Sequence, residues 1–179
     1  MALGSTVLTF DLAISDLDRG VYEEVAVRAA RHPSESGEYL VARILAYALE
    51  YREGIAFTAG LAAAEEPAIE VRDLTGARTA WIEVGTPDGP RLHRATKACE
   101  HVAVYCHRDP EPWLKRLSGA TVFAPERLQL YGLDPAAIGQ LATTLGRRAT
   151  WSVSRAEGEL YVDADGASAS FPLRRLTRV

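Results

Sequence analysis

The chain has 179 residues and a mass of 19.5 kDa, which suits one ordinary domain with a substantial buried core. Its 24 acidic residues outnumber 20 lysines and arginines, and the net charge of −4 argues against a protein that coats nucleic acid or membranes through bulk positive charge. Two cysteines are too few for a disulfide scaffold, so we expect a reducing, cytoplasmic environment.

The charges are unevenly distributed along the chain. Residues 1–90 hold 15 acids and 7 bases, whereas residues 91–179 hold 9 acids and 13 bases. Only two of the bases, Lys97 and Lys115, are lysines. No run approaches the ~18 apolar residues of a membrane-spanning helix, and the first residues lack the pattern of a signal peptide. We therefore expect a soluble protein with no membrane partner.

A hairpin and a helix are the first elements that the chain predicts. Residues 6–15 are mostly apolar and β-branched and residues 22–30 alternate in polarity, so both segments are predicted strands joined by a short turn. The sequence His-Pro-Ser-Glu-Ser at 32–36 ends the second strand and offers Ser34 or Ser36 as a helix N-cap. Apolar residues recur with helical spacing over 37–50, which predicts an amphipathic helix.

The middle of the chain predicts a second hairpin, a basic helix and a buried strand. Residues 69–73 and 78–85 are strand-like and meet at the turn sequence Asp-Leu-Thr-Gly. Residues 91–100 have the composition of a short basic helix. Residues 101–106 form an apolar run that is typical of a strand buried on both faces.

The last third of the chain predicts two more helices and a group of strands. The helices are expected at 112–117 and, behind Asp134 as N-cap and Pro135 as first residue, at about 135–145. The expected strands are 120–124, 149–154, 159–163 and 167–173. We find no internal repeat, low-complexity tract or dividing linker, so the prediction is a single α/β domain over residues 1–179.

Glu83 is the first candidate for chemistry, because it is a lone carboxylate in an otherwise apolar strand. A buried, unpaired carboxylate costs several kcal/mol, so its presence suggests a use, although a salt-bridged glutamate at the end of a strand is an equal alternative. Pairing across the turn puts Glu83 opposite residues 66–68, with Glu66 and Glu70 flanking that position. Two carboxylates on adjacent strands suit Mg²⁺, which could promote phosphodiester cleavage.

The first predicted helix adds further charged candidates. Glu38 lies at the edge of the apolar face, where it could support such a site or merely interact with the helix dipole. We expect Glu35 to be a solvated capping residue. Arg43 could pair with an acid, contact phosphate or stack at the surface.

The basic helix follows Glu83 after only a few residues. Arg91, Arg94 and Lys97 recur every three residues along one side of it, so these cations can face acids, phosphates or water. The short connection favours convergence with the acids, and a structural pair of Glu83 with Arg94 is one possible result.

Several of these segments, taken in order, resemble the bacterial YaeQ family. The resemblance covers most of the chain and weakens after about Phe123, and its motifs are specific when taken together, although none is diagnostic alone. Its motifs are His32-Pro-Ser-Glu-Ser36, Asp73-Leu-Thr-Gly76, Trp81-Ile-Glu-Val-Gly85-x-Pro-Asp88, the Arg91-Leu-x-Arg-Ala helix and the Val-Tyr strand after it. The resemblance implies a PD-(D/E)xK restriction-endonuclease-like fold: a mixed β-sheet core flanked by helices, with additional β-hairpins at the N- and C-terminal ends. It also implies nucleic acid, DNA or RNA, as substrate and Mg²⁺, or Mn²⁺, as cofactor.

The site residues that the resemblance implies are incomplete in this sequence. Glu38 matches the helix acid and Glu83 the acid of the Glu-x-Lys motif, but Gly85 stands where the lysine belongs and Ala68 where the strand aspartate belongs. Lys97 or Arg94 would then contact the phosphate, and Glu66 or Glu70 would complete the metal site. Arg91, Arg94, Lys97 and Arg43 are the predicted nucleic-acid contacts. The expectation is a Mg²⁺-dependent nuclease; the alternative is a non-catalytic relative that binds nucleic acid or a protein partner.

Overall fold

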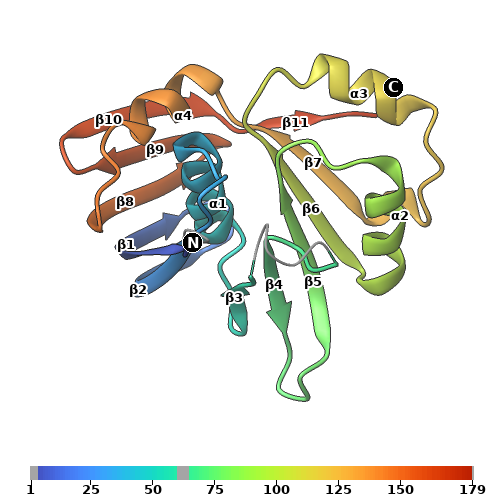
Figure 1. Cartoon of the computed structure of the whole chain (residues 1–179), viewed down its shortest axis with the longest axis horizontal. Coiled ribbons are helices and arrows are strands. Elements are labelled where there is room, and N and C mark those ends of the chain that lie inside the picture. Colours follow the sequence, from blue (N-terminus) through green and yellow to red (C-terminus); the bar gives the residue numbers. More distant parts are fainter. Residues whose placement is uncertain (1–3, 60–64, 179) are drawn as a thin grey trace.

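Two mixed β-sheets lie on either side of helix α1 in the computed structural model, which describes residues 4–59 and 65–178 (Figure 1). The first sheet has the strand order β10-β9-β8-β1-β2. Its strands are β1 (Thr6–Asp16), β2 (Val21–Arg31), β8 (Arg148–Ala156), β9 (Glu159–Ala164) and β10 (Ala167–Pro172). The predicted N-terminal hairpin and the three predicted C-terminal strands are confirmed. Parallel pairing of β1 with β8 joins the two ends of the chain in this sheet.

The second sheet has the strand order β11-β7-β6-β5-β4-β3 and carries the predicted middle hairpin. Its strands are β3 (Ile55–Phe57), β4 (Ile69–Arg72), β5 (Arg78–Val84), β6 (His101–Cys106), β7 (Leu128–Gly132) and β11 (Arg174–Leu176). Strands β5, β6 and β7 are parallel, and the other pairs are antiparallel. The strand predicted at 120–124 is wrong: that segment is irregular, and the strand beside β6 is β7.

The described residues also form four α-helices and a short 3₁₀ turn: α1 (Gly37–Leu49), α2 (Gly89–Ala98), α3 (Glu111–Ser118), α4 (Pro135–Ala142) and η2 (Pro125–Arg127). Ser36, Asp88 and Asp134 cap α1, α2 and α4, because each side chain accepts a hydrogen bond from a backbone N–H in the first turn. Helix α2 begins two residues before the prediction because its cap is Asp88. No helix of the described residues is long and apolar enough to cross a membrane.

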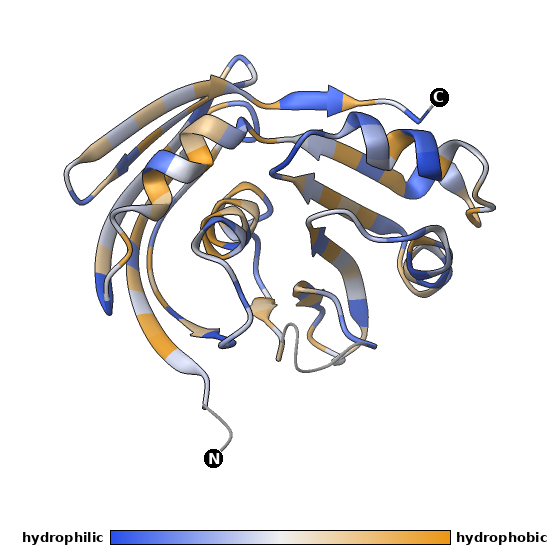
Figure 2. Cartoon of the chain, turned by 45° about the horizontal axis from the view of Figure 1, so that its top comes forward, coloured by the Kyte–Doolittle hydropathy of each residue, from blue (hydrophilic) through white to orange (hydrophobic). Residues whose placement is uncertain are grey.

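Helix α1 is the centre of the largest hydrophobic cluster. All ten residues from Leu40 to Leu49 are buried, so the helix is covered on every side rather than on one face as the amphipathic prediction held. Figure 2 shows the helix nearly end-on between the two sheets. The cluster includes Phe10 and Trp151 of the first sheet and Ile82 of the second.

Helix α2 packs on the other face of the second sheet, where Ala95 meets Trp81 and Val102. The start of α1 lies at the carboxyl end of β5: a Cβ on Gly85 would be 3.9 Å from the Tyr39 ring. Gly85 has φ +95°, a left-handed conformation that favours glycine. The α+β core therefore brings the first turns of α1 and α2 to the same end of β5.

Candidate functional site

Glu83 is buried on the face of β5 that is covered by α2, with only 4% of its surface exposed. Ile69 pairs with Ile82, so the next positions along the two strands put Ala68 beside Glu83. This agrees with the predicted neighbourhood of residues 66–68. The residue that follows in this register is thus an alanine rather than a second acid, and its methyl group is buried in the α1 cluster.

The Glu83 carboxylate is held by two hydrogen-bond donors. Its Oε1 accepts from Trp81 Nε1 at 2.6 Å and from Arg91 Nε at 2.7 Å. Arg91 also donates through Nη2 to the backbone carbonyl of Glu66 at 2.6 Å. Burial raises the pKa of Glu83, and the hydrogen bonds and charge of Arg91 only partly oppose that effect. Glu83 is therefore a salt-bridged glutamate, which was one of the two alternatives. Its partner is Arg91 and not Arg94, the partner that was considered from the sequence.

Glu70 is engaged elsewhere on the hairpin. Its Oε1 is 2.8 Å from Arg72 Nε and its Oε2 is 2.6 Å from Arg78 Nε. Burial alone would raise the Glu70 pKa, but these two arginines lower it below its usual value. Glu70 lies opposite Trp81, so it is on the same face of the sheet as Glu83, but its carboxylate is paired with Arg72 and Arg78.

The residues present do not fit a Mg²⁺ site. No group of three or more His, Cys, Asp or Glu side chains in residues 4–59 and 65–178 is arranged to hold a metal ion. Ala68 offers no oxygen ligand from its side chain, and one of the two Glu83 oxygens, Oε1, already accepts from Trp81 and Arg91. Glu66 reaches this network through its backbone carbonyl.

Glu38 lines an open cavity of about 480 Å³ at the start of α1, whose other lining residues are Ser36, His107, Arg108, Asp109 and Pro135. His107 is buried, and neither ring nitrogen has a hydrogen-bond partner among the described residues. Burial, with a smaller contribution from the Arg108 charge, lowers the His107 pKa to about 4 despite the opposing charge of Glu38. The imidazole is therefore neutral at physiological pH.

Tyr39 lies between this cavity and Glu83. Its ring meets that of His107 edge to face with 6.0 Å between centroids. Burial, together with the negative charge of Glu83, raises the Tyr39 pKa to about 12. The tyrosine is consequently neutral at physiological pH, with its ring against His107 of the cavity that Glu38 lines.

Glu35 and Arg43 form a buried ion pair, which corrects two expectations. Glu35 was expected to be solvated, but it is 4% exposed and its Oε1 lies 3.1 Å from Arg43 Nη2. Arg43 is 1% exposed, donates to the carbonyl of Ala30 at 2.7 Å and lies over the Phe57 ring. It pairs with an acid, as one alternative predicted, and lies in the core rather than on a surface that phosphate could reach. Burial outweighs the Arg43 charge and raises the Glu35 pKa.

The other two cations of α2 point to different surroundings. Arg94 is exposed, with its Nε 3.9 Å from the carboxylate of Glu65, which is more exposed still. Lys97 Nζ lies over the Phe123 ring, 5.9 Å from its centroid. Lys97 is also about 9 Å farther along the helix than Arg91, from the rise per residue. Among the three cations, Arg91 alone is recorded in contact with Glu83.

Glu50 is a further buried acid, which the sequence analysis did not identify as a candidate. It caps the C-terminus of α1, where its oxygens meet Tyr105 Oη at 2.7 Å, His101 Nε2 at 2.8 Å and Arg52 Nη2 at 2.9 Å. Burial would raise the Glu50 pKa, but these partners lower it. An acid is unfavourable at the negative end of a helix, and that placement was the available signal that Glu50 has cationic partners.

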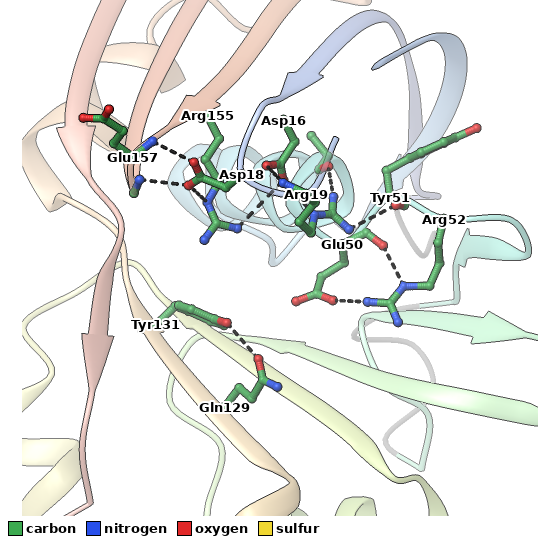
Figure 3. A network of polar contacts seen from close by, with 12 residues as sticks. Asp16, Asp18, Arg19, Glu50, Tyr51, Arg52, Gln129, Tyr131, Arg155 and Glu157 are labelled. Carbon is green, nitrogen blue, oxygen red and sulfur yellow. Dashed lines mark hydrogen bonds and ion pairs between the residues drawn. The ribbon is translucent and has the colours of Figure 1, made fainter. Parts of the chain in front are cut away.

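The same end of α1 is tied to the first sheet (Figure 3). Arg19 in the β1–β2 turn pairs with Asp16 at 2.7 Å and donates to the carbonyl of Tyr51 at 3.2 Å. Asp18 accepts from the backbone N–H groups of Glu157 and Gly158. These contacts join the two hairpins of the first sheet to the helix, so we assign this network a structural role.

Known proteins resemble this chain over almost its whole length. The family described as YaeQ protein matches residues 1–172. Two relatives with the name "Uncharacterized protein YaeQ" are 30% identical over 165 residues, in Salmonella typhi, and 29% identical over 168 residues, in Escherichia coli strain K12. They cover 90% and 92% of this chain and the same shares of their own lengths.

Two crystal structures have the same fold. The YaeQ protein from Pseudomonas syringae gives a TM-score of 0.88 at 33% identity, covering 97% of this chain and 96% of that one. The YaeQ protein from Xanthomonas axonopodis pv. citri gives 0.86 at 32% identity, covering 96% and 97%. Sequence motifs, relatives and fold agree, and this chain belongs to the YaeQ family.

Proposed function

We propose that this chain has a PD-(D/E)xK restriction-endonuclease-like core and binds nucleic acid without cutting it through a metal ion. The observation that carries the proposal is the neutralised carboxylate: Glu83 stands where the nuclease motif has a metal ligand, and its charge is met by Arg91 and Trp81. The protein cation takes the place that a divalent metal would need.

The arrangement of the core supports this placement. Helix α1 packs on a mixed sheet and carries Glu38 in its first turn, while strand β5 of that sheet carries Glu83 and leads into α2. The two groups that would complete catalysis are missing, because Ala68 and Gly85 have no functional side chain. Without a second ligand or a lysine, Glu83 has no means to activate water.

Arg94 and Lys97, the two cations of α2 that do not pair with Glu83, are the proposed phosphate contacts. Arg94 has an exposed side chain, and its nearest carboxylate, Glu65, is also exposed and 3.9 Å away, so solvent screens that pair. Lys97 follows one turn later on the same helix. An exposed guanidinium and ammonium along one helix can follow a phosphate backbone even though the whole protein is acidic.

Fluorescence anisotropy with labelled DNA and RNA oligonucleotides in EDTA tests the proposal. We expect binding that weakens with salt, because each phosphate contact releases counterions. The double variant Arg94→Gln/Lys97→Gln should lower the slope of log affinity against log salt by about 1 for each lost contact. Arg148→Gln, which removes an exposed arginine of the first sheet, is the matched control and should bind like the wild type.

Two outcomes would overturn the proposal. Absence of binding at low salt would remove nucleic acid as the ligand. Cleavage that requires Mg²⁺ or Mn²⁺ and disappears in Glu83→Gln would show that the protein is an active nuclease.

A further inference from the structure

An exposed aromatic side chain lies beside the basic face of α2. Phe123, in the segment between α3 and η2, is 43% exposed, although its neighbour Val122 is buried in the cluster between α2 and α3. The His93 ring meets Phe123 edge to face with 6.4 Å between centroids. A phenylalanine that leaves this much of its surface in water contributes little to the core.

Two cations lie over the Phe123 ring. Lys97 Nζ lies 5.9 Å and Arg127 Cζ 5.6 Å from its centroid. Arg127 Nη1 donates a hydrogen bond to the Thr96 carbonyl of α2 at 3.0 Å, which fixes the guanidinium beside this helix. Its nearest carboxylate, Glu100, is 4.0 Å away and almost fully exposed, so it neutralises Arg127 weakly.

This combination distinguishes between forms of nucleic acid. Unpaired bases stack on aromatic rings while adjacent cations meet the phosphates, which is how sequence-tolerant single-strand sites are built. In a regular duplex the faces of the bases are stacked on one another, so no base face is available to stack on the Phe123 ring. The net charge of −4 also makes a small, local site more suitable than a long basic groove.

We propose, as an extension of the proposed function, that Phe123 with Lys97 and Arg127 forms a stacking platform for single-stranded nucleic acid. A base lies against the part of the phenylalanine ring that stays exposed, and the two cations over the ring meet the adjacent phosphates. Arg94, one turn before Lys97, extends the path of the phosphate backbone along α2.

Titration of labelled single strands and of the matched duplex by fluorescence anisotropy tests the platform. Phe123→Leu keeps an apolar side chain at an exposed position but removes the ring, so its fold is checked by circular dichroism and expected to be unchanged. We expect single-strand affinity to fall about 5-fold or more, the lower end for loss of one base stack. Tyr161→Leu, which removes an exposed aromatic ring of β9, should leave affinity unchanged.

The outcomes separate this inference from the function on which it depends. If single strands bind but Phe123→Leu binds them as tightly as the wild type, the platform is wrong and the proposed function stands. If the duplex binds as tightly as the single strand, the platform is also wrong. If neither form binds at low salt, both proposals fail. Selective loss of single-strand binding in Phe123→Leu supports the platform.

Discussion

Replacing Arg91 by methionine should destabilise the protein because it leaves Glu83 as a buried charge without its cation. Removal of one partner from a buried ion pair costs about 3–5 kcal/mol, but Arg91 keeps 23% of its side chain exposed, so we expect roughly 2–3 kcal/mol. The variant also loses the 2.6 Å hydrogen bond to the Glu66 carbonyl. For a chain of this size each kcal/mol shifts Tm by roughly 2–4 °C, which predicts a decrease of roughly 4–12 °C.

Thermal and urea unfolding of a double-mutant cycle measure this coupling. Glu83→Gln should cost less than Arg91→Met, because glutamine still accepts from Trp81 and leaves no buried charge. The double variant Glu83→Gln/Arg91→Met should be more stable than the sum of the two single effects predicts. Additive single effects, or an Arg91→Met protein as stable as the wild type, would refute the claim that Arg91 neutralises Glu83.

Two further predictions concern the other buried ionisable groups near α1. Arg43→Met should cost about 3–5 kcal/mol in urea unfolding, because both side chains of its pair with Glu35 are 1% exposed, and the double variant Glu35→Gln/Arg43→Met should recover part of that loss; no recovery would contradict it. The pKa of His107 is lowered to about 4, below the unfolded value of about 6.5. The stability that the protein gains from the neutral, buried imidazole is therefore fully present above the unfolded pKa and is lost as pH falls toward 4. His107→Gln should therefore show a smaller loss of unfolding free energy than the wild type between pH 6.5 and 4, and equal losses would contradict it.

The local elements of this fold could be predicted because local chemistry determines them. Strands β1, β2, β4, β5 and β6 follow from alternation or apolar runs, and Ser36 and Asp134 act as the expected caps. Strands β3 and β11 have three residues each, which is too short for a clear pattern, and each is defined by its pairing: β3 with β4, the next strand, and β11 with the distant β7. The wrong strand at 120–124 has a different cause: Val122 is apolar because it fills the cluster between α2 and α3, not because it pairs in a sheet.

The candidate site was predicted in outline, and its partners were not. Glu83 was identified correctly as a buried carboxylate, because a lone acid in an apolar strand is a strong signal at short range. Burial of Glu35 and Arg43 depends on strands of both sheets that lie on either side of α1 (Figure 1). Arg43 donates to the Ala30 carbonyl of β2 and lies over the Phe57 ring of β3. The spacing of residues within one helix gives no information about the strands that cover that helix.

Which arginine of α2 turns toward Glu83 decides what the remaining cations can do. Three residues span 300° of helix, so Arg91, Arg94 and Lys97 follow a slanted path and cannot all face the same strand. Arg91 meets Glu83 because Asp88 caps the helix and fixes its first turn at the end of β5. Arg94 and Lys97 are thereby directed away from Glu83, toward solvent and Phe123. The contact that pairs Arg91 with Glu83 is therefore the one that leaves Arg94 and Lys97 unpaired with Glu83, and the proposed function uses these two cations.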